Sequence, residues 1–471
     1  MKAFVLAIDI GTSGTKALLF DRQGQAHASA YRAYPTQFVG DGAEQDPDEI
    51  LAAVRDCLQQ LLTPSSINQV AAVGFSAAMH SLLGTDHLGR PRTPLYTWGD
   101  LRARHQAAAL RATPVAARLH QQTGTPVHPM SPLCKLVWLR QEAPQLFRDT
   151  ARWMGIKEYV WLHLTGTHWI DHSLASATGL FDLRARTWNK EALTLAGVQP
   201  EQLSMPVSVH AQHNAVREIP THIPLVIGAS DGCLAHLGSD LLTNDDLSLT
   251  IGTSAAVRRL SAAQTDPHGR LFTYWLDDTR CITGGASNNG FSVFQWWHRQ
   301  TGSATDAAAV ERALVNTAPG GGGLQFIPYV LGERAPYYDP DLRPSFHHRT
   351  EKHQQDDLLR AMAEGIACNL QLIINAIEET SGPWRRLVAS GGFVHSPAWV
   401  QLMADLTGHP VDVRDFSDAS ARGAAVMTWH ALGHTVPLQS APAATYLPRP
   451  EFHAQYRKVM AEFMALLPRR S

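Results

Sequence analysis

The chain begins with runs of apolar residues that are typical of β-strands. One run covers 3–10, a second covers 16–21, and a third continues to about Tyr34 after the polar turn 21–24. Their length and spacing predict three consecutive strands joined by short turns. Residues 70–75 are almost continuously apolar, which predicts a further, buried strand.

Helical periodicity follows the first three strands. Asp46 precedes Pro47 and two acidic residues, a pattern typical of a helix N-terminus. The apolar residues that follow recur at helical spacing: Ile50, Leu51, Val54, Leu58 and Leu61. Residues 101–165 are predicted to be mostly helical, and 224–228 predict another buried strand.

The second half repeats this order of elements. Residues 247–260 predict a hairpin, a helix runs through 295–297, and the longest periodic stretch predicts a helix over 354–380. The remaining predicted elements are the strand and turn 387–392, the strand 411–413 and the helices 396–408 and 419–433. Alternating strands and helices predict an α/β fold.

The length and composition fit two large domains. With 471 residues, 44% of them hydrophobic and 17% charged, the chain is an ordinary globular protein. The polar stretch 243–246 predicts a boundary that separates domains 1–243 and 244–471. The net charge of −2 gives no indication of a nucleic-acid partner. There is no apolar run of membrane-spanning length, and the five scattered cysteines favour free thiols, so we expect a cytoplasmic protein.

One tetrapeptide occurs in both halves. Ile-Gly-Thr-Ser stands at 10–13 and again at 251–254, each time between two apolar runs. A Gly turn between strands lets backbone amides and hydroxyls approach a phosphate closely. We therefore predict phosphate contacts from two sets of residues: Gly11, Thr12, Ser13, Thr15 and Lys16, and Gly252, Thr253 and Ser254. Two such hairpins favour a duplicated fold that holds one polyphosphate.

Carboxylates stand beside two of the predicted strands. Asp9 ends the first strand, where it could hold Mg²⁺ against phosphates or simply cap its own turn. Asp231 follows the strand 224–228, where it could take the proton of an attacking hydroxyl or act as a helix N-cap. Lys16 could equally be a solvated strand residue.

Other candidates are weaker when each is taken alone. Gly391 and Gly392 follow a strand and could lie against a nucleotide or cap a helix. A cluster of residues with side chains suited to sugar hydroxyls follows strands of the first half: Met79, His80, Trp98, Asp100 and Arg102. His347, His348 and His353 lack acidic or Cys partners, which argues against a metal site there.

Together these residues resemble the FGGY family of carbohydrate kinases, within the actin, hexokinase and Hsp70 ATPase superfamily. Residues 9–16 look like the family's first phosphate motif, and 130–142 (MSPLCKLVWLRQE) fit its first signature at every constrained position. Residues 364–379 resemble the second signature, and 332–337 (GERAPY) are a further hallmark. The resemblance covers nearly the whole chain.

The resemblance implies two RNase H-like α/β domains around a central cleft, with the sugar mainly on the first and ATP with Mg²⁺ mainly on the second. It implies that Asp231 is the catalytic base and also a metal and sugar contact, and that Asp9 sits at the Mg²⁺ site. Gly252 and Thr253 would contact phosphates, and Gly391 and Gly392 the nucleotide. The family includes dimers, so a homodimer is a further expectation.

The sugar is indicated by four short segments. Residues 76–81 and 98–102 are similar to both gluconate kinases and xylulose kinases, whereas 156–159 and 171–181 look more like gluconate kinases. D-Gluconate is therefore the expected substrate and D-xylulose the alternative. A gluconate carboxylate needs donors, for which His80, Arg102 and Lys157 are candidates. Lys157 equally suits an ion pair.

One departure and two other classes of protein have to be considered. Phe291 stands where related kinases often carry Gly, which puts contacts on the ribose side in doubt. An actin-like or chaperone-like ATPase is an alternative, but nothing after about residue 440 supplies a peptide-binding domain. A sugar-sensing repressor would need a DNA-binding segment, and the chain begins directly with the phosphate hairpin.

Overall fold

The computed structural model describes residues 2–414, 418–437 and 441–467, and it divides into two compact units. The first comprises Met1–Leu242, Ser261–Ile282 and Asp418–Ser440, and the second comprises Thr243–Leu260, Thr283–Ser417 and Ala441–Ser471. The chain leaves the first unit near the expected boundary at 243. Because it then returns twice, the units are not two contiguous halves.

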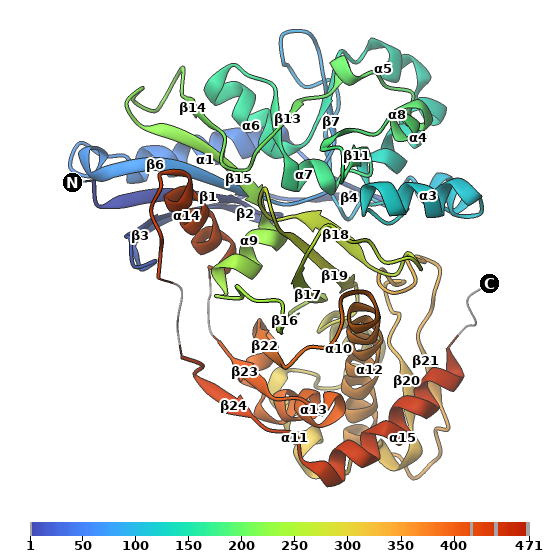
Figure 1. The fold of residues 1–471 in the computed structure, drawn as a ribbon. Helices are drawn as coiled ribbons and strands as arrows, with labels where there is room; N and C mark the ends of the chain where they lie inside the picture. Colours follow the sequence, from blue (N-terminus) through green and yellow to red (C-terminus); the bar gives the residue numbers. More distant parts are fainter. Residues whose placement is uncertain (1, 415–417, 438–440, 468–471) are drawn as a thin grey trace. The chain divides into compact units, whose positions relative to one another are not determined.

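The first unit contains both helices and strands along its whole length (Figure 1). Its strands are β1 (Phe4–Ile10), β2 (Gly14–Phe20), β3 (Ala26–Ala33), β4 (Gln37–Val39), β5 (Gly42–Gln45), β6 (Val70–Ala77), β7 (Leu83–Thr85), β8 (Leu95–Tyr96), β9 (Arg152–Met154), β10 (Trp169–Asp171), β11 (Phe181–Asp182), β12 (Thr187–Trp188), β13 (Met205–Val207), β14 (Gln212–Asn214), β15 (Pro224–Ser230) and β18 (Phe272–Trp275). Its α-helices are α1 (Pro47–Leu61), α2 (Arg104–Arg111), α3 (Pro114–Thr123), α4 (Pro132–Glu142), α5 (Pro144–Asp149), α6 (Ile156–Thr165), α7 (His172–Ser176), α8 (Lys190–Ala196), α9 (Asp231–Gly238) and α14 (Ala419–Ala431).

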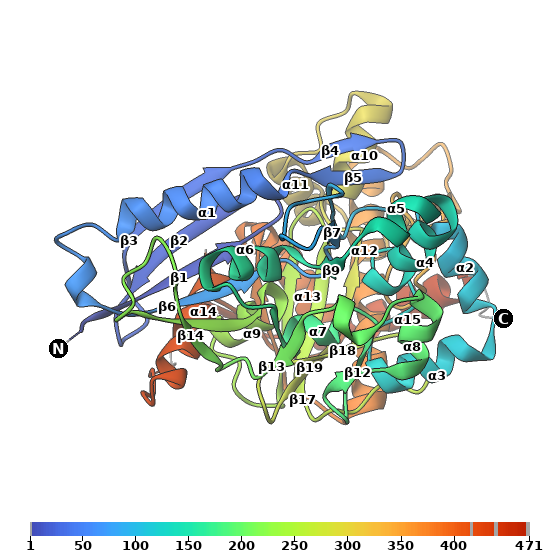
Figure 2. The same ribbon diagram turned by 90° about the horizontal axis from the view of Figure 1, so that it is seen from above.

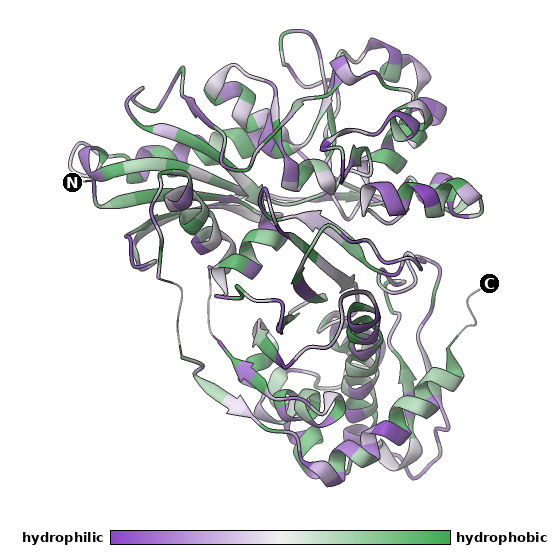
Figure 3. Ribbon diagram, viewed as in Figure 1, coloured by the Kyte–Doolittle hydropathy of each residue, from purple (hydrophilic) through white to green (hydrophobic). Residues whose placement is uncertain are grey.

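The first unit is built on a mixed sheet with the strand order β14-β15-β6-β1-β2-β3. Strands β1, β6 and β15 run parallel, while β2 pairs antiparallel with β1 and β3 pairs antiparallel with β2. Green, hydrophobic shades predominate along β1 and β6 in Figure 3, as expected for strands that are covered on both faces. The three strands predicted at the start of the chain therefore form one half of this sheet.

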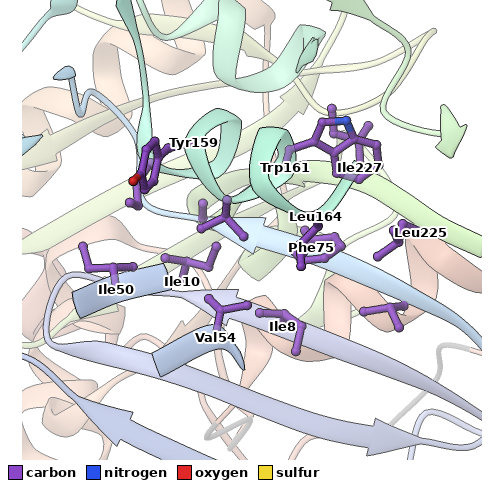
Figure 4. Close-up of a cluster of buried hydrophobic side chains, with 14 of the residues drawn as sticks. Ile8, Ile10, Ile50, Val54, Phe75, Tyr159, Trp161, Leu164, Leu225 and Ile227 are labelled. Atoms are coloured by element: carbon purple, nitrogen blue, oxygen red, sulfur yellow. The ribbon is translucent and has the colours of Figure 1, made fainter. Parts of the chain in front are cut away.

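Helices pack on both faces of this sheet. On one face, apolar side chains of α1 and α6 meet those of β1, β6 and β15, as Figure 4 shows. Phe75 on β6 lies edge-on to Trp161 of α6, with ring centroids 5.8 Å apart. Its neighbour Gly74 faces the other side, where α14 packs against it through Thr428. Figure 2 shows α1 lying along the strands at the β2 and β3 side of the sheet.

Gly228 allows β15 to lie close to β6. Its φ of +69° is in the left-handed region, and a β-carbon there would lie 1.9 Å from the carbonyl oxygen of Phe75. The pairing register between β15 and β6 shifts between Val226 and Ala229, around this residue. Only glycine allows the strand to continue from here to Asp231.

The second unit contains the predicted hairpin and the longest helix. Its strands are β16 (Asp246–Ile251), β17 (Ala255–Ser261), β19 (Cys281–Ser287), β20 (Gln325–Ile327), β21 (Ser345–His347), β22 (Arg386–Ser390), β23 (Val411–Val413) and β24 (Ala444–Tyr446). Its α-helices are α10 (Ser292–Thr301), α11 (Ala307–Asn316), α12 (Gln355–Ser381), α13 (Pro397–Thr407) and α15 (Pro450–Leu466). The strand order β19-β17-β16-β22-β23-β24 again places an antiparallel hairpin beside parallel strands.

The predicted fold class is confirmed, because both units are mixed α/β sheets that begin with a hairpin around an Ile-Gly-Thr-Ser turn. Within the described ranges 2–414, 418–437 and 441–467, no helix is both long and apolar enough to cross a membrane. All five cysteines are buried thiols outside any disulfide.

Candidate functional site

The carboxyl ends of three parallel strands bring the main candidates of the first unit together. Asp9 on β1 pairs in register with Ser76 on β6, and Ser76 pairs with Ala229 on β15. Asp231 follows two residues after Ala229, at the same edge of the sheet. Ligands bind at this edge in open α/β sheets, because the loops that leave the strands surround it.

Asp9 is held in place from the neighbouring strand. The hydroxyl of Ser76 donates to Asp9 Oδ1 at 2.7 Å. Burial raises the pKa of the Asp9 carboxyl above its usual value. The side chain is therefore held at a fixed place and is partly exposed, so that a cation can reach it and would stabilise its ionised form.

Two of the predicted phosphate contacts have other partners. Lys16 Nζ forms an ion pair with Asp418, 2.5 Å away, although its side chain is 40% exposed. Thr15 is fully buried, and its hydroxyl bonds to that of Tyr34. The turn itself stays open, since Gly11 and Thr12 are partly exposed and Ser13 is exposed.

The turn of the first hairpin also lines a small cavity. Gly11 N–H donates to Gly14 O at 3.0 Å, which closes the turn. The indole of Trp98 donates to the Thr12 hydroxyl at 3.0 Å. The cavity beside them is lined mainly by Ile10, Gly11, Thr12, Gln45, Met79 and Trp98. Met79 and Trp98 therefore lie next to the turn for which the sequence predicts phosphate contacts.

His80 follows Met79 in a backbone conformation that is uncommon for residues other than glycine. Its φ is +66°, and its Nδ1 lies 2.8 Å from the carbonyl oxygen of Ala177. A carbonyl can only accept, so Nδ1 carries the proton in this geometry. Non-glycine residues in this region of φ are often found at binding sites.

Asp100 and Arg102 are engaged with each other. Arg102 lies 2.5 Å from Asp100 and 2.7 Å from Glu44, and its guanidinium stacks between the rings of Tyr96 and Trp138. Asp100 also accepts from the backbone N–H of Ala43. In this structure the pair fixes the loop that contains Trp98, and the predicted direct contact with a sugar stays a prediction.

Lys157 is buried rather than exposed to a ligand. Its side chain is 2% exposed, and Nζ lies 2.7 Å from Asp171 and 2.9 Å from the carbonyl oxygen of Ala229. Of the two readings of Lys157, the structure shows the ion pair. The partner of Lys157 is a carboxylate of the protein itself.

Asp231 is the first residue of α9, and Ser230 occupies the N-cap position. Oδ1 of Asp231 accepts the N–H of Gly232 at 2.6 Å. The alternative in which Asp231 is an N-cap is thus not the arrangement observed. The carboxylate is partly exposed, on the short turn between a buried strand and a helix N-terminus.

Glu158 gives the first unit a testable dependence on pH. Burial raises the pKa of its carboxyl to about 8. The pKa of this carboxyl in the unfolded chain is near 4.5. The stability that the protonated form contributes is therefore lost as the pH rises from about 4.5 to about 8. Between pH 6 and pH 9, we expect the free energy of unfolding of the wild type to fall by on the order of 2–3 kcal/mol more than that of Glu158→Gln, as measured by thermal unfolding. Parallel stability curves would contradict this assignment.

The predicted nucleotide contacts of the second unit lie at and beside the turn of the second hairpin. Gly252 N–H donates to Ser254 O at 2.8 Å, which repeats the closure of the first turn. Thr250 and Ser390 bond through their hydroxyls at 3.0 Å across β16 and β22. Gly391 follows with a φ of +93°, so close to Ile251 that a β-carbon would lie 2.7 Å from its carbonyl oxygen. Gly252, Thr253, Ser254 and Gly391 therefore surround the ends of two adjacent strands, and Gly392 is exposed beside them.

Phe291 has a structural place beside this turn. Its N–H donates to the carbonyl oxygen of Gly252 at 2.7 Å, and its ring packs 5.2 Å from Phe294 and 6.4 Å from Trp399. The ring is thus part of the aromatic packing at the start of α10.

Sequence reasoning missed the residues that support the site. Ser76 holds Asp9, Gln45 donates to Thr12 O at 2.6 Å, and Lys135 bonds to the loop carbonyls of His80 and Thr97. Lys135 lies inside the motif 130–142, which was the one available signal. Nothing in the spacing indicated its partners.

Comparisons with known proteins point to one family. Residues 4–238 match the N-terminal domain, and 247–432 the C-terminal domain, of the FGGY family of carbohydrate kinases. The chain is 34% identical to a gluconokinase of Bacillus licheniformis over 99% of this chain and 96% of the relative, and 25% identical to a xylulose kinase of Staphylococcus xylosus over 90% of each. Two Lactobacillus acidophilus structures are each 31% identical and cover 98% of this chain and 97% of their own. They are a ligand-bound xylulose kinase with a TM-score of 0.93 and a gluconate kinase with a TM-score of 0.92.

Proposed function

Because this chain belongs to the FGGY family of carbohydrate kinases, we propose that it transfers the γ-phosphoryl group of ATP to D-gluconate and forms 6-phosphogluconate. The observation that carries the proposal is the placement of Asp9 and Asp231 at the same edge of the sheet, at the ends of the two strands that flank β6, with the cavity that Met79 and Trp98 line next to the turn after β1. Similarity to a gluconokinase over nearly the whole chain supports the sugar acid as acceptor.

Asp231 is proposed to act on the acceptor hydroxyl. Its carboxylate accepts a hydrogen bond from the hydroxyl, orients the oxygen toward the phosphorus and takes the proton as the new bond forms. Phosphoryl transfer proceeds through a loose transition state, so orientation contributes more than proton removal. The short turn from Ser230 into α9 keeps this carboxylate at a defined place.

Asp9 and Asp231 are the residues proposed to hold Mg²⁺. No group of three or more His, Cys, Asp or Glu side chains among the described residues could hold a metal alone. That fits Mg²⁺, which is usually bound by one or two carboxylates together with substrate phosphates. The carboxylate of Asp9 also fits, since its pKa is raised by desolvation, which a cation would offset. The ion would neutralise charge on the phosphates during transfer.

The nucleotide is proposed to bind the second unit. Backbone N–H groups and hydroxyls of Thr253 and Ser254 would donate to phosphate oxygens, Gly252 would let a phosphate approach the turn, and Gly391 and Gly392 would let the nucleotide lie against the backbone. In the first unit, Thr12 and Ser13 would supply equivalent donors beside Gly11. Arg102 and Lys157 have carboxylate partners of their own. The gluconate carboxylate is therefore assigned to donors around the cavity and to His80, whose Nε2 donates when the ring carries a second proton.

The test is sugar-dependent ADP release with Mg-ATP across D-gluconate, D-xylulose, D-ribulose, L-ribulose, glycerol and L-fuculose. We expect kcat/KM for gluconate to exceed that for every other sugar by about 10²-fold, because a site that pairs with a carboxylate rejects acceptors that lack one. Faster turnover of D-xylulose would show that D-xylulose is the substrate and would leave the proposed mechanism unchanged. The similarity in fold to a xylulose kinase makes that the second candidate. ADP release that no sugar stimulates would contradict the kinase assignment.

A further inference from the structure

Two lysines of the first unit are buried almost completely. Lys135 on α4 has an exposed fraction of 0%, and Lys157 on α6 has one of 2%. Lysine side chains are rarely buried to this extent, because the ammonium group loses its hydration. Burial lowers the pKa of Lys135 to about 7 and also lowers the pKa of Lys157. A buried ammonium group needs hydrogen-bond acceptors to replace its lost hydration. The acceptors of Lys135 differ from those of Lys157.

Lys135 connects the two loops that line the cavity. Its Nζ donates to the carbonyl oxygen of His80 and to that of Thr97, at 2.6 Å each. His80 follows Met79 and Thr97 precedes Trp98, so one ammonium group fixes the backbone on both sides of the proposed sugar contacts. It also bonds to the one residue of these loops whose φ, +66°, is unfavourable for a side chain. Removing Lys135 would leave that strained conformation without its anchor.

Lys157 connects to the turn that carries the base. Its Nζ lies 2.9 Å from the carbonyl oxygen of Ala229, two residues before Asp231. Asp171, its ion-pair partner, is fixed in turn because it caps α7 by accepting the N–H of Leu174. Ser173 of the same helix bonds to both the N–H and the hydroxyl of Ser230.

The end of β15 is therefore held at two successive residues, Ala229 and Ser230, directly before the carboxylate of Asp231. Three acidic groups raise the pKa of Lys157 against the effect of burial: Asp171, Glu158 on its own helix, and Asp231 on α9.

We propose that the two buried lysines are positioning residues with separate tasks: Lys135 holds the sugar-binding loops, and Lys157 holds the turn of the base Asp231. This inference rests on the proposed function and adds to it residues that touch neither substrate. Each acts through backbone carbonyls, so its loss should disturb the loop that it holds and leave the other in place.

The first test needs no substrate. Backbone hydrogen–deuterium exchange is measured on wild type, Lys135→Met and Lys157→Met, with Lys190→Met, a change at an exposed lysine, as the matched control. Lys157→Met should exchange faster at 229–233 and remain like wild type at 79–81 and 96–98. Lys135→Met should show the reverse. Uniform acceleration in both variants, or none in either, would overturn the division of tasks.

The second test separates kcat from KM, with the panel sugar that the wild type turns over fastest. Lys157→Met should lower kcat by about 10²-fold, because a misplaced base costs that much, and leave the sugar KM nearly unchanged. Lys135→Met should raise the sugar KM roughly tenfold with a smaller change in kcat, as expected for the loss of charge-assisted hydrogen bonds in the binding loops. A rise in KM for Lys157→Met with kcat unchanged would instead mean that Lys157 contacts the sugar.

Further variants distinguish failure of the inference from two other outcomes: a variant that does not fold, and a substrate other than D-gluconate. Lys135→Gln and Lys157→Gln keep a donor for a carbonyl, so they should restore part of the lost function. Lys157→Met could fail to fold because Asp171 is left unpaired. In that case the double variant Lys157→Gln with Asp171→Asn, which removes both charges of this ion pair, replaces it in both tests. If D-gluconate is not an acceptor, another sugar carries the kinetic test. If no sugar is turned over, the proposed function fails and the exchange pattern still decides the roles of the lysines.

Discussion

Asp231→Asn is expected to lose phosphoryl transfer by about 10²–10⁴-fold while sugar binding is retained. Asparagine has the shape of aspartate and can still accept the N–H of Gly232, so the turn into α9 should be preserved. It cannot take the proton of the acceptor hydroxyl, and its amide nitrogen would face that hydroxyl as a second donor. The loss should therefore appear in kcat, with the sugar affinity nearly unchanged.

The measurement is ADP release at saturating sugar and Mg-ATP, together with the thermal shift that the sugar causes in the absence of nucleotide. Asp149→Asn, a change at an exposed aspartate that bonds only to Gln145 among the contacts given by the structure, is the matched control and should behave like wild type. Turnover near the wild-type rate in Asp231→Asn would remove Asp231 from the role of base.

Gly228→Ala is expected to cost more than about 4 kcal/mol of folding free energy, or to prevent soluble expression altogether. The added β-carbon would lie 1.9 Å from the carbonyl oxygen of Phe75, which is backbone and cannot turn away. The left-handed φ of +69° adds a further cost for any residue with a β-carbon. The strand that ends at Asp231 would have to separate from β6.

The matched control for this substitution is Gly166→Ala. Gly166 has nearly the same φ, +74°, but nothing lies within 4 Å of a β-carbon there. It should therefore lose only about 1–2 kcal/mol, the cost of the left-handed conformation alone. Urea unfolding of both variants measures the difference. Equal losses would show that the close contact with Phe75 contributes nothing.

The order of elements followed from local patterns. Asp46 caps α1 by accepting the N–H groups of Asp48 and Glu49, as its position before Pro47 predicted. The apolar periodicity over 354–380 became α12, and the repeated Ile-Gly-Thr-Ser turns became the two equivalent hairpins. These features depend on residues a few positions apart, so the sequence contains the whole of their cause.

Candidate residues at strand ends were also predictable. Asp9 and Asp231 were chosen because each follows a buried strand, and parallel strands place their carboxyl ends at one edge. The structure brings both to that edge. What the pattern could not supply is the charge environment of each candidate. Lys16 pairs with a residue 402 positions away, and Lys157 pairs with Asp171 inside the first unit.

The sequence by itself determined the α/β class, the two phosphate turns and the acidic residues beside them, because glycine conformation, strand periodicity and capping act over short distances. Only the tertiary structure decided which cations remain available to a ligand. An ammonium or guanidinium group takes whichever carboxylate or carbonyl the fold brings within about 3 Å, since an unpaired buried charge is too unfavourable to persist. For Arg102 and Lys157 those partners are carboxylates of the protein itself, which is why we assign the carboxylate of the sugar acid to other donors.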